Sequence, residues 1–368
     1  MARLTGRGPR SLHVIPSMGY GGAERQAAYL AQGLTALGHD VHIALFAGGE
    51  NLPLLERSGA TVHWLVPRGN YDPRRLLELE GVARRVAPDL IQTWLNMANV
   101  LGGLVALRMG VPWVYAERYT PDAYERSLKV AFDHWLARRR AAAVISNSTS
   151  ADRLWARVLA PGRPHGVIRN ALPLHELDAL APAEPGALGL PPDLPLVVYV
   201  GRMLPHKGID TLLEAIARVN AERKVAALLL GVGELHGAVR ARLAEPAFGG
   251  RALAPGFRYD TAAWLKRAAV FVSLSQHEGM PNTVMEAMAM RCPAVLSDIP
   301  SHRELFGDDA VLLVPFGDAA AAAAAILRTL DEPAAAAARA ARARQAADAW
   351  SIEATTRAWA DLYRRLVP

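Results

Sequence analysis

The chain has 368 residues, of which 51% are apolar and 21% are charged, and its formal net charge is +6. This length suits two domains of ordinary size, and the composition is that of a globular protein and excludes a disordered one. The single cysteine, Cys292, excludes a disulfide framework and a cysteine-rich metal site. We therefore expect a protein of a reducing compartment, in the cytoplasm.

The positive charge is concentrated in residues 1–170, whereas the remainder of the chain is slightly acidic. Such an imbalance points to an anionic partner, which is a nucleic acid, a phospholipid surface or a phosphorylated acceptor, or else to solvated arginines without a partner. No segment has the ~18 uninterrupted apolar residues of a membrane span. The apolar run after the basic N-terminus is short, so no secretory signal is expected there.

Strands and helices alternate from the start of the chain. Short apolar runs predict strands at 11–16, 41–46, 61–66, 90–94, 112–116 and 142–146. Apolar residues at helical spacing predict helices at 23–37, 74–86 and 98–107, with further helices after the last two strands. This alternation predicts a parallel sheet with helices on both faces.

The alternation stops near 167–173 and restarts after a Pro- and Gly-rich crossover at 182–195. Strands are predicted at 196–200, 225–230, 251–254, 269–274, 293–296 and 310–314, and helices at 210–219, 235–243, 261–268, 283–290, 319–330, 334–347 and 350–366. We therefore predict an α/β protein of two doubly wound, Rossmann-like domains, residues 1–170 and 171–349, that face each other across a cleft. The ligand should lie at the carboxyl ends of the strands.

Residues 277–289 hold the most informative pattern of the chain. Glu278 follows a buried strand in a loop forced by Gly279 and Pro281, and Glu286 lies in the helix that follows. Asn282 or Thr283 is expected to cap this helix, whose first N–H groups form an anion site. A carboxylate on an otherwise apolar helix needs a partner, which is a protein group or a ligand.

Two further loops at strand ends carry groups suited to phosphate. Gly201 opens a loop that holds Arg202 and Lys207, and Gly233 lies in a second glycine-rich loop. The cations neutralise phosphate, the glycines let backbone approach a ligand closely, and the two glutamates accept hydrogen bonds from hydroxyls. Each motif alone has an ordinary structural explanation, as a turn with a salt bridge or a helix entry. Together they predict a site for a diphosphate with a polyhydroxy group beside it.

The first half offers a glycine-rich turn, residues 19–22, after its first strand. It lacks the third glycine of a dinucleotide fingerprint, and the second strand has no acid at its end, so an NAD site is not expected. We expect the amides of Gly21 and Gly22 to face a phosphate or sugar held by the other domain.

Other polar and aromatic side chains follow strands of the first half. They could line an acceptor site or simply cap helices, and they are Trp94, Asn96, Asn99, Glu117, Arg118, Tyr119 and Asn147. The run Arg138–Arg140 with Phe132 and Trp135 nearby is either an amphipathic basic face for an anionic membrane or a solvated helix end. The histidines show no metal spacing, and no Asp-x-Asp pair stands at a strand end.

The second-half motifs resemble those of the retaining glycosyltransferases of family 4, which have the two-domain GT-B fold. The resemblance rests on Gly201-Arg202…Lys207-Gly208, on Glu278-Gly279-Met280-Pro281 and on Glu286, eight residues after Glu278. It extends to residues 21–24 and 168–170 and covers nearly the whole chain. It implies that residues 1–170 form an acceptor-binding domain and residues 171–349 a nucleotide-sugar-binding domain, and that the last helix, within 350–368, crosses back to the first domain.

The resemblance also implies a reaction. A sugar passes from a nucleotide sugar, here expected to be a UDP-sugar, to an acceptor hydroxyl in the synthesis of a cell-surface polysaccharide or glycolipid. No metal and no other cofactor is expected, and no nucleic acid partner. The enzyme is expected in the cytoplasm, with peripheral contact to an anionic membrane. The alternatives are a non-catalytic nucleotide-sugar-binding protein, a related epimerase, or a glycosyltransferase of a small natural product.

The resemblance assigns roles by position. Arg202, Lys207 and Glu278 are the implied catalytic residues: the two cations hold the donor diphosphate, and Glu278 contacts the donor sugar. Further implied donor-binding residues are Glu286 at the ribose, Phe257 and Arg258 at the base, Gly21, Gly22, Gly201 and Gly233 at the diphosphate, and Gly279, Met280, Pro281, Asn282 and Thr283 at sugar hydroxyls and phosphate. Where many members place a histidine, this chain has Glu117-Arg118-Tyr119.

Overall fold

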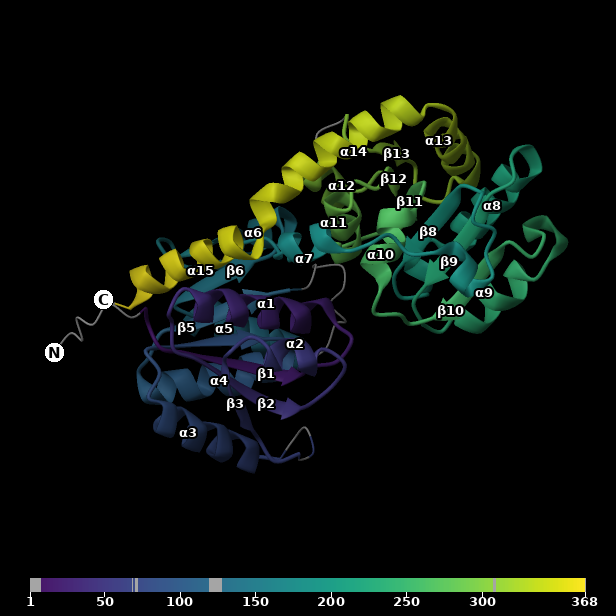
Figure 1. Ribbon diagram of the computed structural model, residues 1–368. Coiled ribbons are helices and arrows are strands. Elements are labelled where there is room, and N and C mark those ends of the chain that lie inside the picture. Colours follow the sequence, from purple (N-terminus) through teal and green to yellow (C-terminus); the bar gives the residue numbers. More distant parts are fainter. Residues whose placement is uncertain (1–7, 68, 70–71, 119–127, 307–308, 368) are drawn as a thin grey trace. The chain divides into compact units, whose positions relative to one another are not determined.

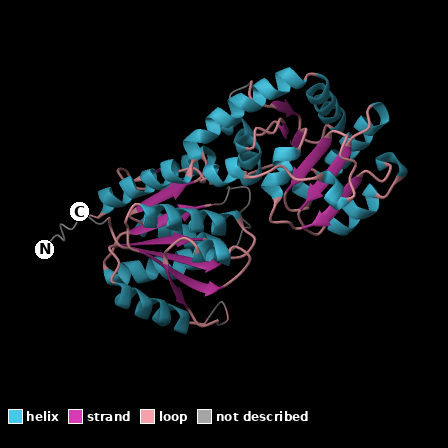
Figure 2. Cartoon of the chain, viewed as in Figure 1, coloured by secondary structure: helices cyan, strands magenta, loops and turns pink. Residues whose placement is uncertain are grey.

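The computed structural model describes residues 8–67, 69, 72–118, 128–306 and 309–367. The chain divides into two compact units (Figure 1). The first unit comprises Met1–Ala171 and Trp350–Pro368, and the second comprises Leu172–Ala349. Helices surround a parallel sheet in each unit (Figure 2).

The first unit is built on a seven-stranded sheet of order β3-β2-β1-β4-β5-β6-β7. Its strands are β1 (Ser11–Ser17), β2 (Val41–Ala47), β3 (Thr61–Trp64), β4 (Leu90–Trp94), β5 (Trp113–Glu117), β6 (Ala143–Ser146) and β7 (His165–Val167). Its helices are α1 (Gly22–Ala36), α2 (Leu52–Glu56), α3 (Arg74–Val86), α4 (Asn96–Met109), α5 (Leu128–Arg140), α6 (Thr149–Val158) and α15 (Ile352–Leu366). The short elements α2 and β7 have no counterpart in the sequence-based prediction.

The second unit has a six-stranded sheet of order β10-β9-β8-β11-β12-β13. Its strands are β8 (Leu196–Val200), β9 (Ala226–Leu230), β10 (Ala252–Gly256), β11 (Val270–Ser273), β12 (Ala294–Ser297) and β13 (Leu312–Val314). Its α-helices are α7 (Leu174–Ala179), α8 (Ile209–Glu222), α9 (His236–Leu243), α10 (Thr261–Arg267), α11 (Asn282–Ala289), α12 (Pro300–Leu305), α13 (Ala319–Asp331) and α14 (Pro333–Ala347).

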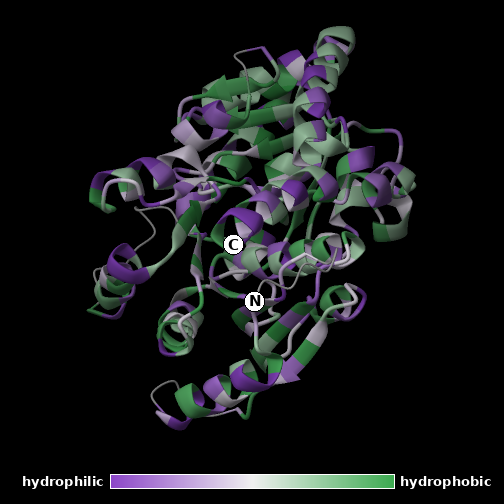
Figure 3. Cartoon of the chain, turned by 90° about the vertical axis from the view of Figure 1, so that its left-hand side faces the viewer, coloured by the Kyte–Doolittle hydropathy of each residue, from purple (hydrophilic) through white to green (hydrophobic). Residues whose placement is uncertain are grey.

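Burial on both faces of the first sheet explains why its strands are continuous apolar runs. Along β2, Ile43 and Leu45 join the apolar cluster on one face, whereas Ala44 and Phe46 join the cluster on the other. Figure 3 shows the strands mainly in green and more hydrophilic colours on the helices. A parallel sheet sandwiched between helices has this pattern.

The last helix, α15, belongs to the first unit. Trp359 and Tyr363 lie in the same apolar cluster as α1 residues, and the hydroxyl of Tyr363 bonds the side chain of Gln92 in β4 over 2.5 Å. The predicted return of the chain to its first domain is therefore confirmed.

Both sheets follow the doubly wound order, with the direction of winding reversed between β1 and β4 and between β8 and β11. A crevice at the carboxyl ends of the strands forms at such a switch point. The predicted fold class, with two Rossmann-like domains, is confirmed. The cleft between the domains stays a prediction, as do the acceptor and donor roles given to them.

Candidate active site

An ion pair lies at the switch point of the second unit. β8 and β11 are neighbours, so the loops that follow them meet at one edge of the sheet. Lys207 from the first loop and Glu278 from the second lie 2.6 Å apart, from Nζ to Oε1, with both side chains about 15% exposed. Two residues 71 positions apart in the chain thus form an ion pair that is partly exposed to solvent.

Glu278 is held ionised by its partners. Burial by itself would raise its pKa, but Lys207 and the hydroxyl of Ser275, which donates to Oε1 over 2.7 Å, lower the pKa below its ordinary value. Ser275 is fixed in turn, because Ser297 donates to its carbonyl oxygen over 2.5 Å, and His302 contacts the Ser297 carbonyl over 2.7 Å. A series of hydrogen bonds through Ser275, Ser297 and His302 therefore supports the Glu278 carboxylate.

The two loops are also joined beside the ion pair. The rings of His206 and His277 stack with centroids 4.8 Å apart and planes within 13°. The backbone N–H of Gln276 donates to the carbonyl oxygen of His206 over 2.8 Å. These contacts fix Lys207 and Glu278 relative to each other. The sequence analysis missed both histidines, although each is the immediate chain neighbour of a predicted residue.

Glu286 is buried, with 7% of its surface exposed, on the apolar helix α11. The helix begins at Asn282 with Pro281 at the capping position. The expectation that Asn282 or Thr283 caps α11 is therefore wrong, because both lie within its first turn. Met280 is buried beside this helix start.

Arg202 is exposed, and its backbone carbonyl accepts a hydrogen bond from the hydroxyl of Tyr199 over 2.9 Å. In the described part of the chain, no carboxylate forms an ion pair with the Arg202 side chain. Its guanidinium is therefore accessible to an anion at the same sheet edge as Lys207.

The glycines after β9 lie very close to the backbone of the loop after β8. Gly231 has φ +129°, and a Cβ there would lie 2.0 Å from the carbonyl oxygen of Gly201. A Cβ on Gly233 would lie 2.4 Å from the carbonyl oxygen of Met203. The close approach expected of Gly233 is therefore made to protein backbone, and Gly231 and Gly233 let their loop pack closely on the Arg202 loop.

Phe257 and Arg258 follow β10. Phe257 is 41% exposed and packs edge to face on Tyr259, with centroids 4.9 Å apart. Arg258 makes a two-pronged ion pair with Asp260, at 2.7 Å for each bond, which raises its pKa. Phe257 is thus partly exposed, whereas the Arg258 guanidinium is engaged by Asp260.

In the first unit, the glycine-rich turn lies between β1 and α1, as predicted, and Gly22 is the first residue of α1. The side-chain amide of Asn51 donates to the carbonyl oxygens of Gly19 and, over 3.4 Å, Gly21. These bonds hold the carbonyl oxygens of the turn, and the expected role of the Gly21 and Gly22 amides stays a prediction. Asn51 gave no signal in the sequence, because it precedes the unpredicted helix α2.

Two of the predicted acceptor residues, Trp94 and Arg118, pack against other side chains of the first unit. Trp94 is 1% exposed, and its indole N–H donates to Nδ1 of His13 over 3.3 Å. The Arg118 guanidinium lies over the rings of Trp94 and Trp359, at 4.6 and 5.7 Å from their centroids. Burial lowers the pKa of Arg118 to about 10. The expectation that Trp94 lines an open site is therefore wrong, and Arg118 instead joins β5 to the last helix.

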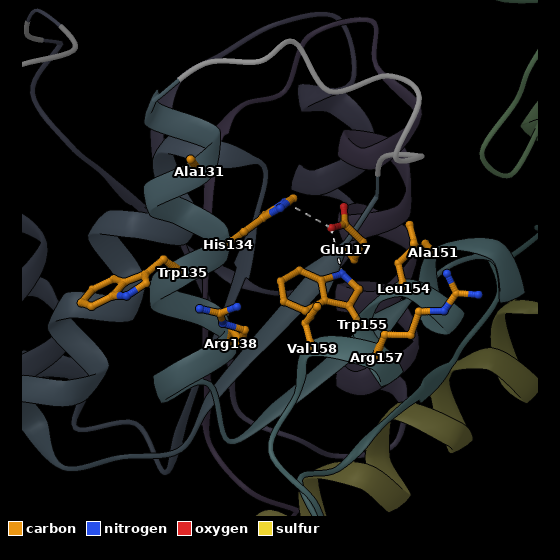
Figure 4. Close-up of a pocket in the computed structure, with 10 residues that line it drawn as sticks. All are labelled: Glu117, Ala131, His134, Trp135, Arg138, Ala151, Leu154, Trp155, Arg157 and Val158. Carbon is orange, nitrogen blue, oxygen red and sulfur yellow. Dashed lines mark hydrogen bonds and ion pairs between the residues drawn. The ribbon is translucent and has the colours of Figure 1, made fainter.

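Glu117 is also buried, at the end of β5, but it lies at the floor of a pocket of about 540 Å³ (Figure 4). Its Oε2 accepts a hydrogen bond from the indole of Trp155 over 3.1 Å and lies 3.8 Å from Nε2 of His134. Asn96 is the first residue of α4. Tyr119 lies outside the described residues.

In the described ranges, no group of three His, Cys, Asp or Glu side chains could hold a metal ion. Nor does any helix there have the length and apolar content needed to cross a bilayer. The expected absence of a metal and the expected membrane contact stay predictions.

Two family models match the chain. Residues 20–176 match the model described as Glycosyltransferase Family 4, and residues 194–332 match the one described as Glycosyl transferases group 1. The first match falls almost wholly within the first unit, and the second lies within the second unit.

Individual proteins agree with these matches. The lipopolysaccharide core biosynthesis glycosyltransferase LpsE of Rhizobium meliloti is 29% identical over 68% of this chain and 68% of its own length. The putative teichuronic acid biosynthesis glycosyltransferase TuaC of Bacillus subtilis is 36% identical, but over only 38% of this chain and 34% of its own length. The crystal structure of Anabaena HepE in complex with UDP and glucose has a TM-score of 0.86 at 20% identity and covers 97% of this chain and all of that one. At this identity the structural likeness establishes the fold.

Proposed function

The chain belongs to the family 4 glycosyltransferases, and we propose that it transfers a sugar from a UDP-sugar, with retention of configuration, to an acceptor hydroxyl in the synthesis of a cell-surface polysaccharide or glycolipid. The observation that carries this proposal is the Lys207–Glu278 pair at the switch point of the second unit. The assignment of LpsE to lipopolysaccharide core biosynthesis and of TuaC to teichuronic acid biosynthesis supports the kind of product, and the UDP bound to HepE supports the kind of donor.

The cations at this edge of the second sheet are suited to cleavage of the bond between the donor sugar and its phosphate. When the bond between the sugar C1 and the phosphate oxygen opens, negative charge gathers on the departing UDP. Lys207 and the exposed Arg202 would stabilise that charge. The acceptor hydroxyl would enter on the face from which UDP leaves, and its proton would pass to the departing phosphate oxygen.

Glu278 fits an orienting role better than a nucleophilic one. Its Oε1 is committed to Lys207 and Ser275. An ammonium group has three donors, so Lys207 can keep Glu278 and still bind phosphate. The carboxylate would then accept a hydrogen bond from a donor-sugar hydroxyl, and Glu286 would bind the ribose.

The test begins with the donor. The intact protein is screened by thermal shift against UDP-, GDP- and ADP-sugars, because a ligand that binds only the folded state raises the melting temperature. The donor that binds is then incubated with lipid-linked and soluble glycan acceptors, with and without EDTA. We expect a UDP-sugar to bind, and a product with the anomeric configuration of the donor by NMR, unaffected by EDTA.

Other results would contradict parts of the proposal. An inverted product would overturn retention, and inhibition by EDTA would overturn metal independence. Binding of UDP without consumption of any donor would indicate a non-catalytic binding protein. An isomerised sugar formed without acceptor would indicate an epimerase.

A further inference from the structure

A pocket lies between α5 and α6 of the first unit, and the proposed reaction uses none of its lining residues. Its volume of about 540 Å³ is within the range of small-molecule sites. The lining residues are Glu117, Ala131, His134, Trp135, Arg138, Ala151, Leu154, Trp155, Arg157 and Val158 (Figure 4). Most of these side chains present carbon to the cavity.

Large apolar side chains are exposed around this pocket. Leu154 and Val158 of α6 are 38% and 47% exposed, and Trp135 of α5 is 45% exposed. Phe132, which stacks on Trp135 with centroids 5.7 Å apart, continues the apolar surface along α5. A cluster of exposed apolar groups around a cavity indicates a binding site, because such groups otherwise gain free energy by burial.

Glu117, at the floor of the pocket, already has a hydrogen-bond donor. Glu117 accepts the indole N–H of Trp155 and faces His134, whose pKa is lowered by burial. The ring of His134 packs on that of Trp155, with centroids 5.1 Å apart. The pocket therefore does not present a row of open polar groups to a sugar, and its surface suits a hydrocarbon.

Cations flank the groove from both helices. Arg138 comes from α5 and Arg157 from α6, and both are exposed (Figure 4). No ion pair with either arginine occurs in the part of the chain that the structure describes. Two uncompensated guanidinium groups beside an apolar cavity complement a ligand with a hydrocarbon chain and an anionic head.

We propose that this pocket binds the hydrocarbon chain of a single lipid molecule, with its phosphate between Arg138 and Arg157. Arg138 and Arg157 lie in the last turns of α5 and α6, so the phosphate would lie beside the C-terminal ends of both helices.

The experiment uses dodecyl phosphate, below its critical micelle concentration, titrated into the intact protein by calorimetry. Inorganic phosphate and the neutral dodecyl maltoside are the companion ligands. Leu154→Asp places a charge in the pocket wall, and Leu107→Asp is its matched control, because both leucines are 38% exposed on helices of the same unit. Ala131→Trp fills the pocket without adding a charge.

We expect dodecyl phosphate to bind at one site and inorganic phosphate not to bind. Leu154→Asp should weaken binding by about 10-fold or more, since the chain would have to desolvate a carboxylate, and Ala131→Trp should weaken it similarly. Leu107→Asp should bind as the wild type does. The double variant Arg138→Gln/Arg157→Gln should weaken dodecyl phosphate but leave dodecyl maltoside unchanged.

Equal binding by the Leu154→Asp and Leu107→Asp variants would overturn the proposal. So would flotation with phosphatidylglycerol vesicles without uptake of dodecyl phosphate, because that result would assign the surface to a bilayer. Transfer to a soluble acceptor is measured in parallel. Lipid binding without any transfer would refute the proposed function and leave the pocket assigned, whereas transfer without lipid binding would refute the pocket alone.

Discussion

The two sheets of this protein share one strand order, but the polar side chains at their carboxyl edges are placed differently. At the switch point of the second unit, Lys207 and Glu278 meet in a half-open ion pair. At the corresponding edge of the first unit, Trp94 and Arg118 lie inside, and Arg118 is stacked against Trp359 of the last helix. The same strand order therefore carries a partly exposed ion pair in one unit and an anchor for the chain end in the other.

The difference lies in what covers each edge. In the first unit, Trp359 of the last helix packs against the Arg118 guanidinium, and the hydroxyl of Tyr363 bonds Gln92. The loops after β8 and β11 instead contact each other and residues at the ends of β9 and β12, and the Arg202 side chain stays exposed. A charged residue after a strand thus predicts a sheet edge, but the neighbouring element decides whether its side chain faces a ligand or the core.

The largest expected effect tests the anchor. Trp359→Ala should lower the free energy of unfolding of the first unit by about 3–5 kcal/mol, because a Trp side chain that is 1% exposed leaves a cavity against α1, Trp94 and Arg118. Chemical denaturation followed by circular dichroism measures the change. Trp64→Ala is the control, since Trp64 is 54% exposed on β3 and should change stability by less than about 0.5 kcal/mol. Equal effects would mean that the last helix is no anchor.

The next effect tests the proposed active site around Lys207 and Glu278. Lys207→Ala should lower turnover with the identified donor by about 10²–10³-fold, because a preorganised charge at the leaving group is lost. Steady-state kinetics measure it, with Lys224→Ala as the control, an exposed lysine of the same unit. Wild-type turnover in Lys207→Ala would contradict the assignment of this edge as the active site.

The smallest effect compares two buried carboxyl groups with opposite pKa shifts. Burial raises the pKa of Asp133 in α5 to about 7, although Asn99 and the hydroxyl of Tyr115 donate to it. Stability from protonated Asp133 is complete below its ordinary pKa of 3.8 and is lost as the pH rises toward 7. The lowered pKa of Glu278 has the opposite sign, so its contribution is lost as the pH falls below about 4.5.

Unfolding measured between pH 2.5 and pH 8 separates the two groups. Asp133→Asn should remove the decline in stability of the first unit toward neutral pH, since the amide cannot ionise. Glu278→Gln should flatten the acid limb in the second unit and leave the neutral range unchanged. A pH profile of Asp133→Asn identical to that of the wild type would show that Asp133 ionises without cost in the folded protein.

Much of the fold was accessible from the sequence, because strands buried on both faces are uninterrupted apolar runs. β4 and β8 begin and end at the predicted residues. The helix α2 and strand β7 escaped prediction, since five and three residues are too short to show a period. The motif residues Lys207 and Glu278 were likewise accessible, because each follows a recognisable strand.

What the sequence alone determined is therefore the set of strand ends and the chemistry placed on them. The tertiary structure decided which of those groups meet. It joined Lys207 to Glu278 by pairing β8 with β11, turned Arg118 onto Trp359, and opened a pocket between α5 and α6 above Glu117. Strand pairing and helix packing join residues distant in the chain, and no local periodicity encodes those contacts.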